Sequence, residues 1–204
     1  SSMVAQGWKR PAYFAITIPD EYYSYFENQD GGYKFTTSAG MAYALTPINM
    51  LAYKSVGSGY TDKAYRNITE HYRWGGLDKA TPGNVPYYDE TAARMVNSTR
   101  ISIVEAAQNL IKEAEMAADL KEHNDSLKVD VPARVMTDGF IADRYNKART
   151  LLHLMEQKLP WFAVNASFSI IEDTASAYFT IAHATGNSDD MKRGSQLMEQ
   201  LLTN

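Results

Sequence analysis

Residues 64–103 decide the fold of this chain, and they read AYRNITEHYRWGGLDKATPGNVPYYDETAARMVNSTRISI. A helix-like segment ends at Trp74-Gly75-Gly76, and a loop that contains Pro and Gly follows it. Asp89 then stands where a helix begins, because a carboxylate at the N-cap accepts hydrogen bonds from the free amides of the first turn. The stretch therefore predicts two helices joined by a loop, and with them a mainly helical domain.

The helix that starts after Asp89 has the i, i+3, i+4 apolar spacing of a half-buried helix. Its apolar face comprises Ala92, Met95, Val96, Thr99, Ile103, Ala106, Ala107, Leu110, Ile111, Ala114 and Ala118. The polar residues 121–130 predict a loop after it. Three further helices, each bounded by Pro or Gly or by the end of the chain, are expected at 142–159, 168–185 and 191–202.

The first part of the chain has a different composition. Of its 14 tyrosines, all but Tyr145 and Tyr178 lie at or before Tyr88. Residues 13–18 and 40–45 have the aromatic, β-branched or alternating pattern of short strands, and a Gly-containing turn lies between them. We therefore expect an aromatic-rich, β-containing part at residues 1–60 and a helical-repeat part at residues 61–204, in one compact unit.

The short antiparallel helices predict a tetratricopeptide-like stack of helical hairpins. Ala148, Leu152 and Pro160 have the spacing of the second helix of such a unit, in which the small residue allows close approach and Pro ends the helix. The match is partial, because no clean period of about 34 residues appears. The expected fold class is mainly α: tetratricopeptide-like helical hairpins with a small N-terminal β element.

The composition excludes several kinds of function. The net charge is −4 and no basic block stands out, so nucleic acid is not an expected partner. The absence of Cys excludes disulfides and thiolate chemistry. No apolar run reaches the roughly 18 residues that would span a bilayer. The four histidines lack metal-ligand spacing and no nucleophile motif appears, so we expect no catalytic residue, metal or cofactor.

Aromatic residues are the candidates for contact with a ligand or partner, because aromatic faces stack on sugar rings and also pack against proteins. The competing interpretation is a small core between the β part and the helices. Under both interpretations we expect the candidate residues at the junction between the β part and the helices. The candidates are Tyr22, Tyr23, Tyr25, Phe26, Arg73, Trp74, Gly75 and Gly76. The acidic pairs Glu172-Asp173 and Asp189-Asp190 are expected at helix starts, where they stabilise the helix dipole.

Four blocks of the sequence resemble a family of bacterial membrane proteins that are similar to protein O-mannosyltransferases. Residues 11–18 are similar to its R-P-x-Y-F-A-x-T opening, and residues 40–48 to its G-L-A-Y-R-L-x-P-I pattern. Residues 65–76 resemble its Y-x-N…F-x-W-G segment, and residues 88–97 its Y-x-D-E-x-x-R-R-M helix start. The blocks occur in the family's order, and Ala44 replaces the family's Arg.

The resemblance implies that this chain is the non-catalytic, extracytoplasmic C-terminal region of a membrane glycosyltransferase, on the periplasmic face of the inner membrane. Its expected partner is the membrane-embedded remainder of the same protein, together with an acceptor protein or glycan that it positions. Two alternatives remain open. One is a free-standing tetratricopeptide-like scaffold that binds protein. The other is a carbohydrate-binding lipoprotein domain with surface aromatic residues.

Overall fold

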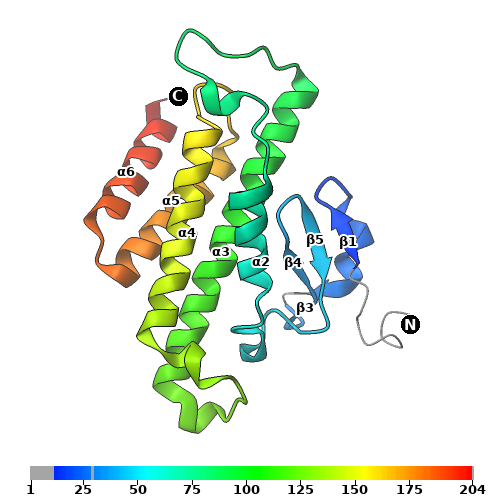
Figure 1. The fold of residues 1–204 in the computed structure, drawn as a ribbon, viewed down its shortest axis with the longest axis vertical. Coiled ribbons are helices and arrows are strands. Elements are labelled where there is room, and N and C mark those ends of the chain that lie inside the picture. Colours follow the sequence, from blue (N-terminus) through cyan, green and yellow to red (C-terminus); the bar gives the residue numbers. More distant parts are fainter. Residues whose placement is uncertain (1–11, 29, 204) are drawn as a thin grey trace.

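The computed structural model describes residues 12–28 and 30–203 (Figure 1). The start of the first resemblance block, Pro11, lies outside the described residues. Five α-helices and two small sheets make up the described part of the chain. The mainly helical fold class with a small N-terminal β element is therefore confirmed.

The helices occupy the second half of the chain and the segment just before it. Their bounds are α2 Tyr60–Arg66, α3 Glu90–Leu127, α4 Asp138–Lys158, α5 Phe168–Thr185 and α6 Ser188–Thr203. A π-helical turn, Asn67–His71, continues α2. Helix α3 packs most extensively on α4, and α5 on α6. None of the described helices combines the length and the apolar character that a membrane span requires.

Helix α3 begins as the sequence predicts. The Asp89 carboxylate accepts a hydrogen bond of 2.7 Å from the Ala92 amide. Most of the apolar stripe is buried against α4 and α5, although Met95 and Ala118 are exposed on the surface. The predicted loop at 121–130 is wrong in its first part, because α3 continues to Leu127 with a kink at His123. Leu127 at the end of this extension packs against a second apolar cluster that includes Ala117 and Leu120.

The ends of the later helices follow from single residues. Helix α4 ends just before Pro160, which cannot donate a backbone hydrogen bond. Helix α5 ends at Gly186, whose φ of 70° is a left-handed conformation that glycine adopts without a steric penalty. Asn187 begins α6, because its side-chain oxygen accepts a hydrogen bond of 2.8 Å from the Asp189 amide. The Glu172-Asp173 pair does not start a helix, since it lies in the second turn of α5.

The β part consists of two small antiparallel sheets. The strands are β1 Tyr13–Ala15, β2 Glu27–Asn28, β3 Tyr33–Lys34, β4 Thr36–Ser38 and β5 Ala42–Leu45. One sheet has the order β1-β5-β4, with Phe14 opposite Tyr43 and Ser38 also opposite Tyr43. The other sheet pairs β2 with β3. Both predicted strands are present, but the first is shorter than the segment 13–18.

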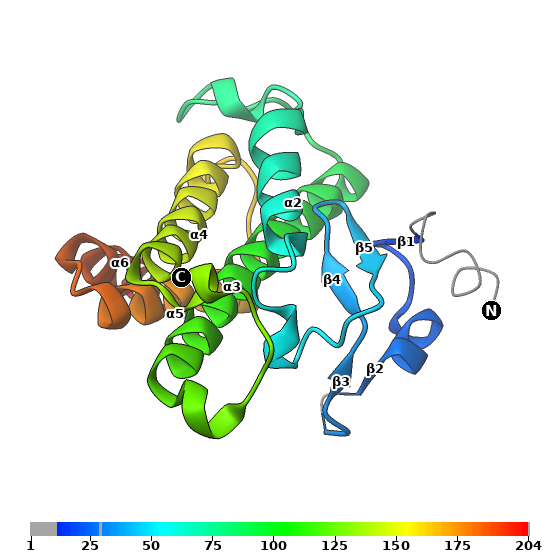
Figure 2. The ribbon, with the colours of Figure 1, turned by 60° about the horizontal axis from the view of Figure 1, so that its bottom comes forward.

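The sheet β1-β5-β4 lies beside α2 and α3, whereas α4, α5 and α6 lie on the other side of α3 (Figures 1 and 2). Strand β4 contacts both α2 and α3. Hydrogen bonds fasten the turn of the β4–β5 hairpin to the helices: Asn67 donates to the Ala39 carbonyl at 2.8 Å, and Ser102 donates to the Gly40 carbonyl. Because α3 carries the sheet on one side and three helices on the other, it is the central element of the fold.

Candidate functional site: a polar crevice between the sheet and helix α3

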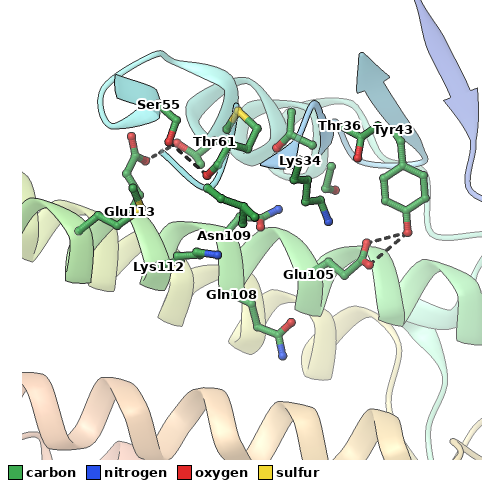
Figure 3. Close-up of a pocket in the computed structure, with 15 residues that line it drawn as sticks. Lys34, Thr36, Tyr43, Ser55, Thr61, Glu105, Gln108, Asn109, Lys112 and Glu113 are labelled. Carbon is green, nitrogen blue, oxygen red and sulfur yellow. Dashed lines mark hydrogen bonds between the residues drawn. The ribbon is translucent and has the colours of Figure 1, made fainter. Parts of the chain in front are cut away.

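A crevice of about 290 Å³ opens where the sheet meets α3 (Figure 3). Strands β3 to β5 and the segment that follows them form one wall, and α3 forms the other. Its lining residues are Lys34, Thr36, Thr37, Ser38, Tyr43, Met50, Leu51, Ser55, Thr61, Glu105, Gln108, Asn109, Lys112, Glu113 and Met116. Most of them are polar, so the crevice is suited to a ligand that forms hydrogen bonds.

One end of the crevice holds a tyrosine–carboxylate pair. The Tyr43 hydroxyl of β5 lies 2.9 Å and 3.1 Å from the two carboxylate oxygens of Glu105 on α3. Burial raises the pKa of Glu105 above its ordinary value, and the hydrogen bond from Tyr43 only partly offsets that effect. Burial and the neighbouring charge of Glu105 also raise the pKa of Tyr43. The tyrosine therefore remains a neutral hydrogen-bond donor at neutral pH.

The other end is closed by a second carboxylate, Glu113, which is buried and fully engaged by its neighbours. Its oxygens accept hydrogen bonds from the Gly57 amide at 2.7 Å and from the Thr61 hydroxyl at 2.5 Å. Arg144 of α4 lies 3.3 Å from the same carboxylate. Because each of these contacts joins a different element to α3, Glu113 is a structural residue that fixes the shape of the crevice.

Arg144 also belongs to a network of charges that joins α2 to α4. It lies 2.9 Å from Asp62, and Lys147 lies 2.6 Å from the same carboxylate. Burial alone would raise the pKa of Asp62, but the hydrogen bonds from Lys147 and Arg144 outweigh it and lower the pKa. Asp62 therefore stays ionised, and the network holds α2 in place behind the crevice.

The middle of the crevice carries polar groups that are free to bind. Among the described residues, none forms a hydrogen bond or ion pair with the side chains of Asn109 and Lys112 on α3. Asn109 is half-buried and Lys112 is exposed at the rim. On the opposite wall, Lys34 lies 3.2 Å from Glu27 and points into the same space as Asn109 (Figure 3). This arrangement offers both donors and acceptors to a bound molecule.

The charged groups that line the crevice are balanced in sign. Of its two carboxylates, Glu113 is held by Arg144 and Glu105 by Tyr43. Within residues 12–28 and 30–203, no group of three or more His, Asp or Glu side chains is placed to hold a metal ion. The lining has two basic and two acidic residues, so it has no strong excess of either charge.

The aromatic candidates Tyr22, Tyr23, Tyr25 and Phe26 divide into two pairs. Tyr22 and Tyr25 are exposed, at 58% and 84% of their surface. Tyr23 and Phe26 instead pack against Phe14 of β1, with ring centroids 6.2 Å and 5.8 Å away. The second pair therefore belongs to a small aromatic core on the sheet, while the first pair faces solvent.

The candidates from Arg73 to Gly76 lie beyond the end of the π-helical turn. Trp74 packs against Tyr72, with ring centroids 5.6 Å apart, and against the main helical core. Gly75 and Gly76 have φ values of 60° and 89°, so they form the turn that only glycine adopts readily. Arg73 is exposed. None of these eight candidate residues lines the crevice.

The crevice residues were missed because their sequence signal is ambiguous. Glu105, Asn109, Lys112 and Met116 are spaced at three and four residues along α3, next to the apolar stripe. Such a row is typical of a solvated helix face, and sequence alone does not reveal that a sheet lies over it. Lys34 sits in a short strand far away in the sequence, with no local feature that links it to α3.

Comparisons of the chain with protein-family models, with curated proteins and with solved structures gave no match.

Proposed function

We propose that this chain is the extracytoplasmic C-terminal domain of a membrane glycosyltransferase that resembles protein O-mannosyltransferases. In this role the domain is not catalytic and positions the acceptor for the membrane-embedded enzyme. One observation carries the proposal. Four sequence blocks resemble the family, and they are separated along the chain. In the structure they contact one another in the region where the sheet meets the helices.

The contacts between the blocks are specific. The first and second blocks pair as neighbouring strands, with Phe14 opposite Tyr43. The third block meets the second where a Cβ atom at Gly40 would lie 2.8 Å from the Tyr72 hydroxyl, and Asn67 donates to the carbonyl of Ala39, the residue just before the second block. The third block meets the fourth where the Tyr88 hydroxyl donates to the Gly75 carbonyl at 3.1 Å. Residues that define a fold shared by a family are expected to contact one another, so the contacts between the four blocks support the family resemblance.

We also propose that α3 to α6 form two tetratricopeptide-like units. The chain order of two hairpins, α3 with α4 and α5 with α6, supports this, as does the contact of α5 with α3. Ala148 and Leu152 are buried in α4, as the second helix of such a unit requires. The 38 residues of α3 depart from the usual repeat, so the units are irregular.

The proposal is tested first by the coding sequence upstream of the codon for Ser1. We expect it to encode many apolar segments of about 20 residues, as a polytopic membrane protein requires. A short secretion signal, or a start codon immediately upstream, would contradict the proposal. Those results would favour a lipoprotein domain or a free-standing scaffold instead.

A deletion then tests the role of the domain. The residues of this chain are removed from the full-length protein in its native cell, and glycosylated proteins are measured by intact-protein mass spectrometry. We expect the glycan to be lost from acceptor proteins while the membrane portion is still inserted at its normal level. Unchanged glycosylation with the domain absent would show that it does not position the acceptor.

A further inference from the structure

We propose that the crevice between the sheet and α3 binds a short extended polypeptide segment, uncharged and carrying one aliphatic side chain. The inference rests on the proposed function, because it names the acceptor that the domain would position as a polypeptide. Four features of the crevice support it: its size, its free polar groups, its apolar end and its charge.

The size of the crevice limits what it can hold. Its volume of about 290 Å³ lies just below the range of roughly 300–1,000 Å³ that is common for ligand pockets. A few residues of an extended chain fit into such a space, whereas a folded surface does not enter it. The occupant is therefore a segment that projects from a loop, a tail or an unfolded region.

The free polar groups match a peptide backbone. Each peptide unit carries one N–H donor and one carbonyl acceptor. The side-chain amide of Asn109 offers both complementary groups, and within the described structure it has no protein partner. Asn109 projects from the middle of a long helix whose neighbouring turns are buried, so its position is fixed before a ligand arrives. Lys112, one turn further along, provides a donor for a carbonyl at the rim.

The end of the crevice near Glu113 supplies an apolar surface. Met116 follows Lys112 and Glu113 by one turn on α3, and Met50 and Leu51 line the same crevice from the segment after β5. All three are half-buried. Methionine is unbranched and adapts its shape to different apolar groups. This end therefore suits one aliphatic side chain of the bound segment without demanding a single sequence.

Charge and the placement of aromatic rings disfavour strongly charged ligands and sugars. A strongly acidic ligand would meet Glu105 and the buried Glu113, while a strongly basic one would meet Lys34 and Lys112. A sugar ring usually stacks on an aromatic face. Tyr43 is the one aromatic residue among the described residues of the lining, and its ring already packs against Tyr23 at a centroid distance of 5.4 Å. The balanced charge and the lack of a free aromatic face in the described lining favour an uncharged peptide segment.

The test begins with selection of peptides against the full chain from a phage-displayed library of random dodecapeptides. Enriched peptides are synthesised, and their affinities are measured by isothermal titration calorimetry. We expect Asn109→Ala to weaken binding about tenfold, because the backbone of the peptide loses its amide partner. Gln157→Ala is the matched control, since it removes an exposed amide from α4, away from the crevice.

Methionine methyl groups report where the peptide binds. The chain has 9 methionines, of which Met50 and Met116 line the crevice, while Met95 and Met191 are exposed elsewhere. With ¹³C-methyl labelling, the peptide should shift the NMR signals of Met50 and Met116 and leave those of Met95 and Met191 in place. Because Asn109 has no partner among the described residues, its variant should keep the wild-type melting temperature.

The proposal is overturned if no peptide is enriched, if the enriched peptides bind Asn109→Ala as tightly as wild type, or if the shifts appear only at Met95 or Met191. Oligosaccharides that shift the Met50 and Met116 signals where peptides do not would also overturn it. These results are separate from the test of the proposed function. Peptide binding without a membrane-spanning parent would support the peptide site and remove the glycosyltransferase role. A membrane-spanning parent without peptide binding would support the glycosyltransferase role and remove the peptide site.

Discussion

Arg100 shows how a single residue can join distant parts of this molecule. Its side chain is completely buried, and its guanidinium donates to the carbonyls of Leu159, Pro160 and Val164 at 2.8–3.0 Å. These carbonyls lie at the end of α4 and in the segment after it, where the Pro160 carbonyl also accepts a hydrogen bond of 3.1 Å from the Ala163 amide. The guanidinium also lies 4.9 Å from the Trp161 ring centroid. Burial lowers its pKa to about 10, so it remains charged at neutral pH.

Replacing Arg100 tests this role. We expect Arg100→Ala to lower the free energy of unfolding by about 3 kcal/mol, because the buried carbonyls lose a charged donor and a cavity forms. Urea denaturation followed by circular dichroism measures the change. Arg94→Ala is the control, since Arg94 is exposed and lies 3.6 Å from Glu90 on the surface of the same helix. It should cost less than about 0.5 kcal/mol, and an equal loss in both variants would contradict the argument.

Glu105 predicts a pH dependence of stability. Burial raises its pKa in the folded protein, so ionisation costs more there than in the unfolded chain. Its contribution to the unfolding free energy therefore falls as pH rises from the unfolded pKa to the higher folded pKa. Glu105→Gln keeps an acceptor for Tyr43 without the charge, and we expect it to be more stable than wild type at neutral pH.

The difference between Glu105→Gln and wild type should shrink towards zero as pH falls below about 4, where the carboxylate is protonated in both states. Urea denaturation over a series of pH values measures it. Glu122→Gln, at an exposed position on the same helix, serves as the control and should show no comparable gain. A constant difference at every pH would show that burial of the charge is not its source.

At the scale of elements, helices α5 and α6 approach each other closely at a glycine. A Cβ atom at Gly194 of α6 would lie 2.7 Å from the ring of Phe179 on α5. By contrast, Gly139 in the first turn of α4 has nothing within 4 Å of its Cβ position among the described residues. Alanine substitutions at the two glycines therefore distinguish the destabilising effect of overpacking from the stabilising effect of alanine's helix propensity.

We expect Gly194→Ala to lower the free energy of unfolding by about 1 kcal/mol, because overpacking outweighs the better helix propensity of alanine. Gly139→Ala should raise it by roughly 0.5–1 kcal/mol, since only the propensity acts there. Thermal and urea denaturation of both variants measure these changes. A gain in stability at Gly194 would mean that α5 and α6 leave room for a methyl group at this point.

At the scale of the whole molecule, the sheet and the helices share one set of contacts across α2 and α3. Glu105 with Tyr43, Ser102 with Gly40, and Asn67 with Ala39 all cross the boundary near residue 60. The sheet has no large core of its own among the described residues, because it contributes few buried apolar side chains. The predicted single compact unit is consistent with these contacts.

A single unit predicts a single unfolding transition. Far-UV circular dichroism follows the helices, and near-UV circular dichroism follows the tyrosines, most of which lie in the first part of the chain. We expect the two thermal transitions to coincide, as in two-state unfolding of a small domain. Two separate midpoints would show that residues 1–60 and 61–204 unfold as independent domains.

The sequence by itself determined the local elements of this protein. Asp89 predicted the start of α3, Pro160 the end of α4, and Gly186 the end of α5, because each acts through the backbone of its immediate neighbours. The aromatic and β-branched residues of 13–18 and 40–45 likewise predicted strands. These preferences are set within a few residues, so no knowledge of the rest of the chain is needed to infer them.

Only the tertiary structure decided where these elements meet. The crevice exists because the sheet lies over α3, which brings Lys34 of β3 opposite Asn109. The burial of Arg100 likewise depends on the segment after α4. In the extension of α3 past residue 121, Leu127 packs against an apolar cluster that includes Val56, which lies far away in the sequence. Such contacts join residues far apart in the sequence, and the fit of side chains across the fold selects them, so local patterns do not contain them.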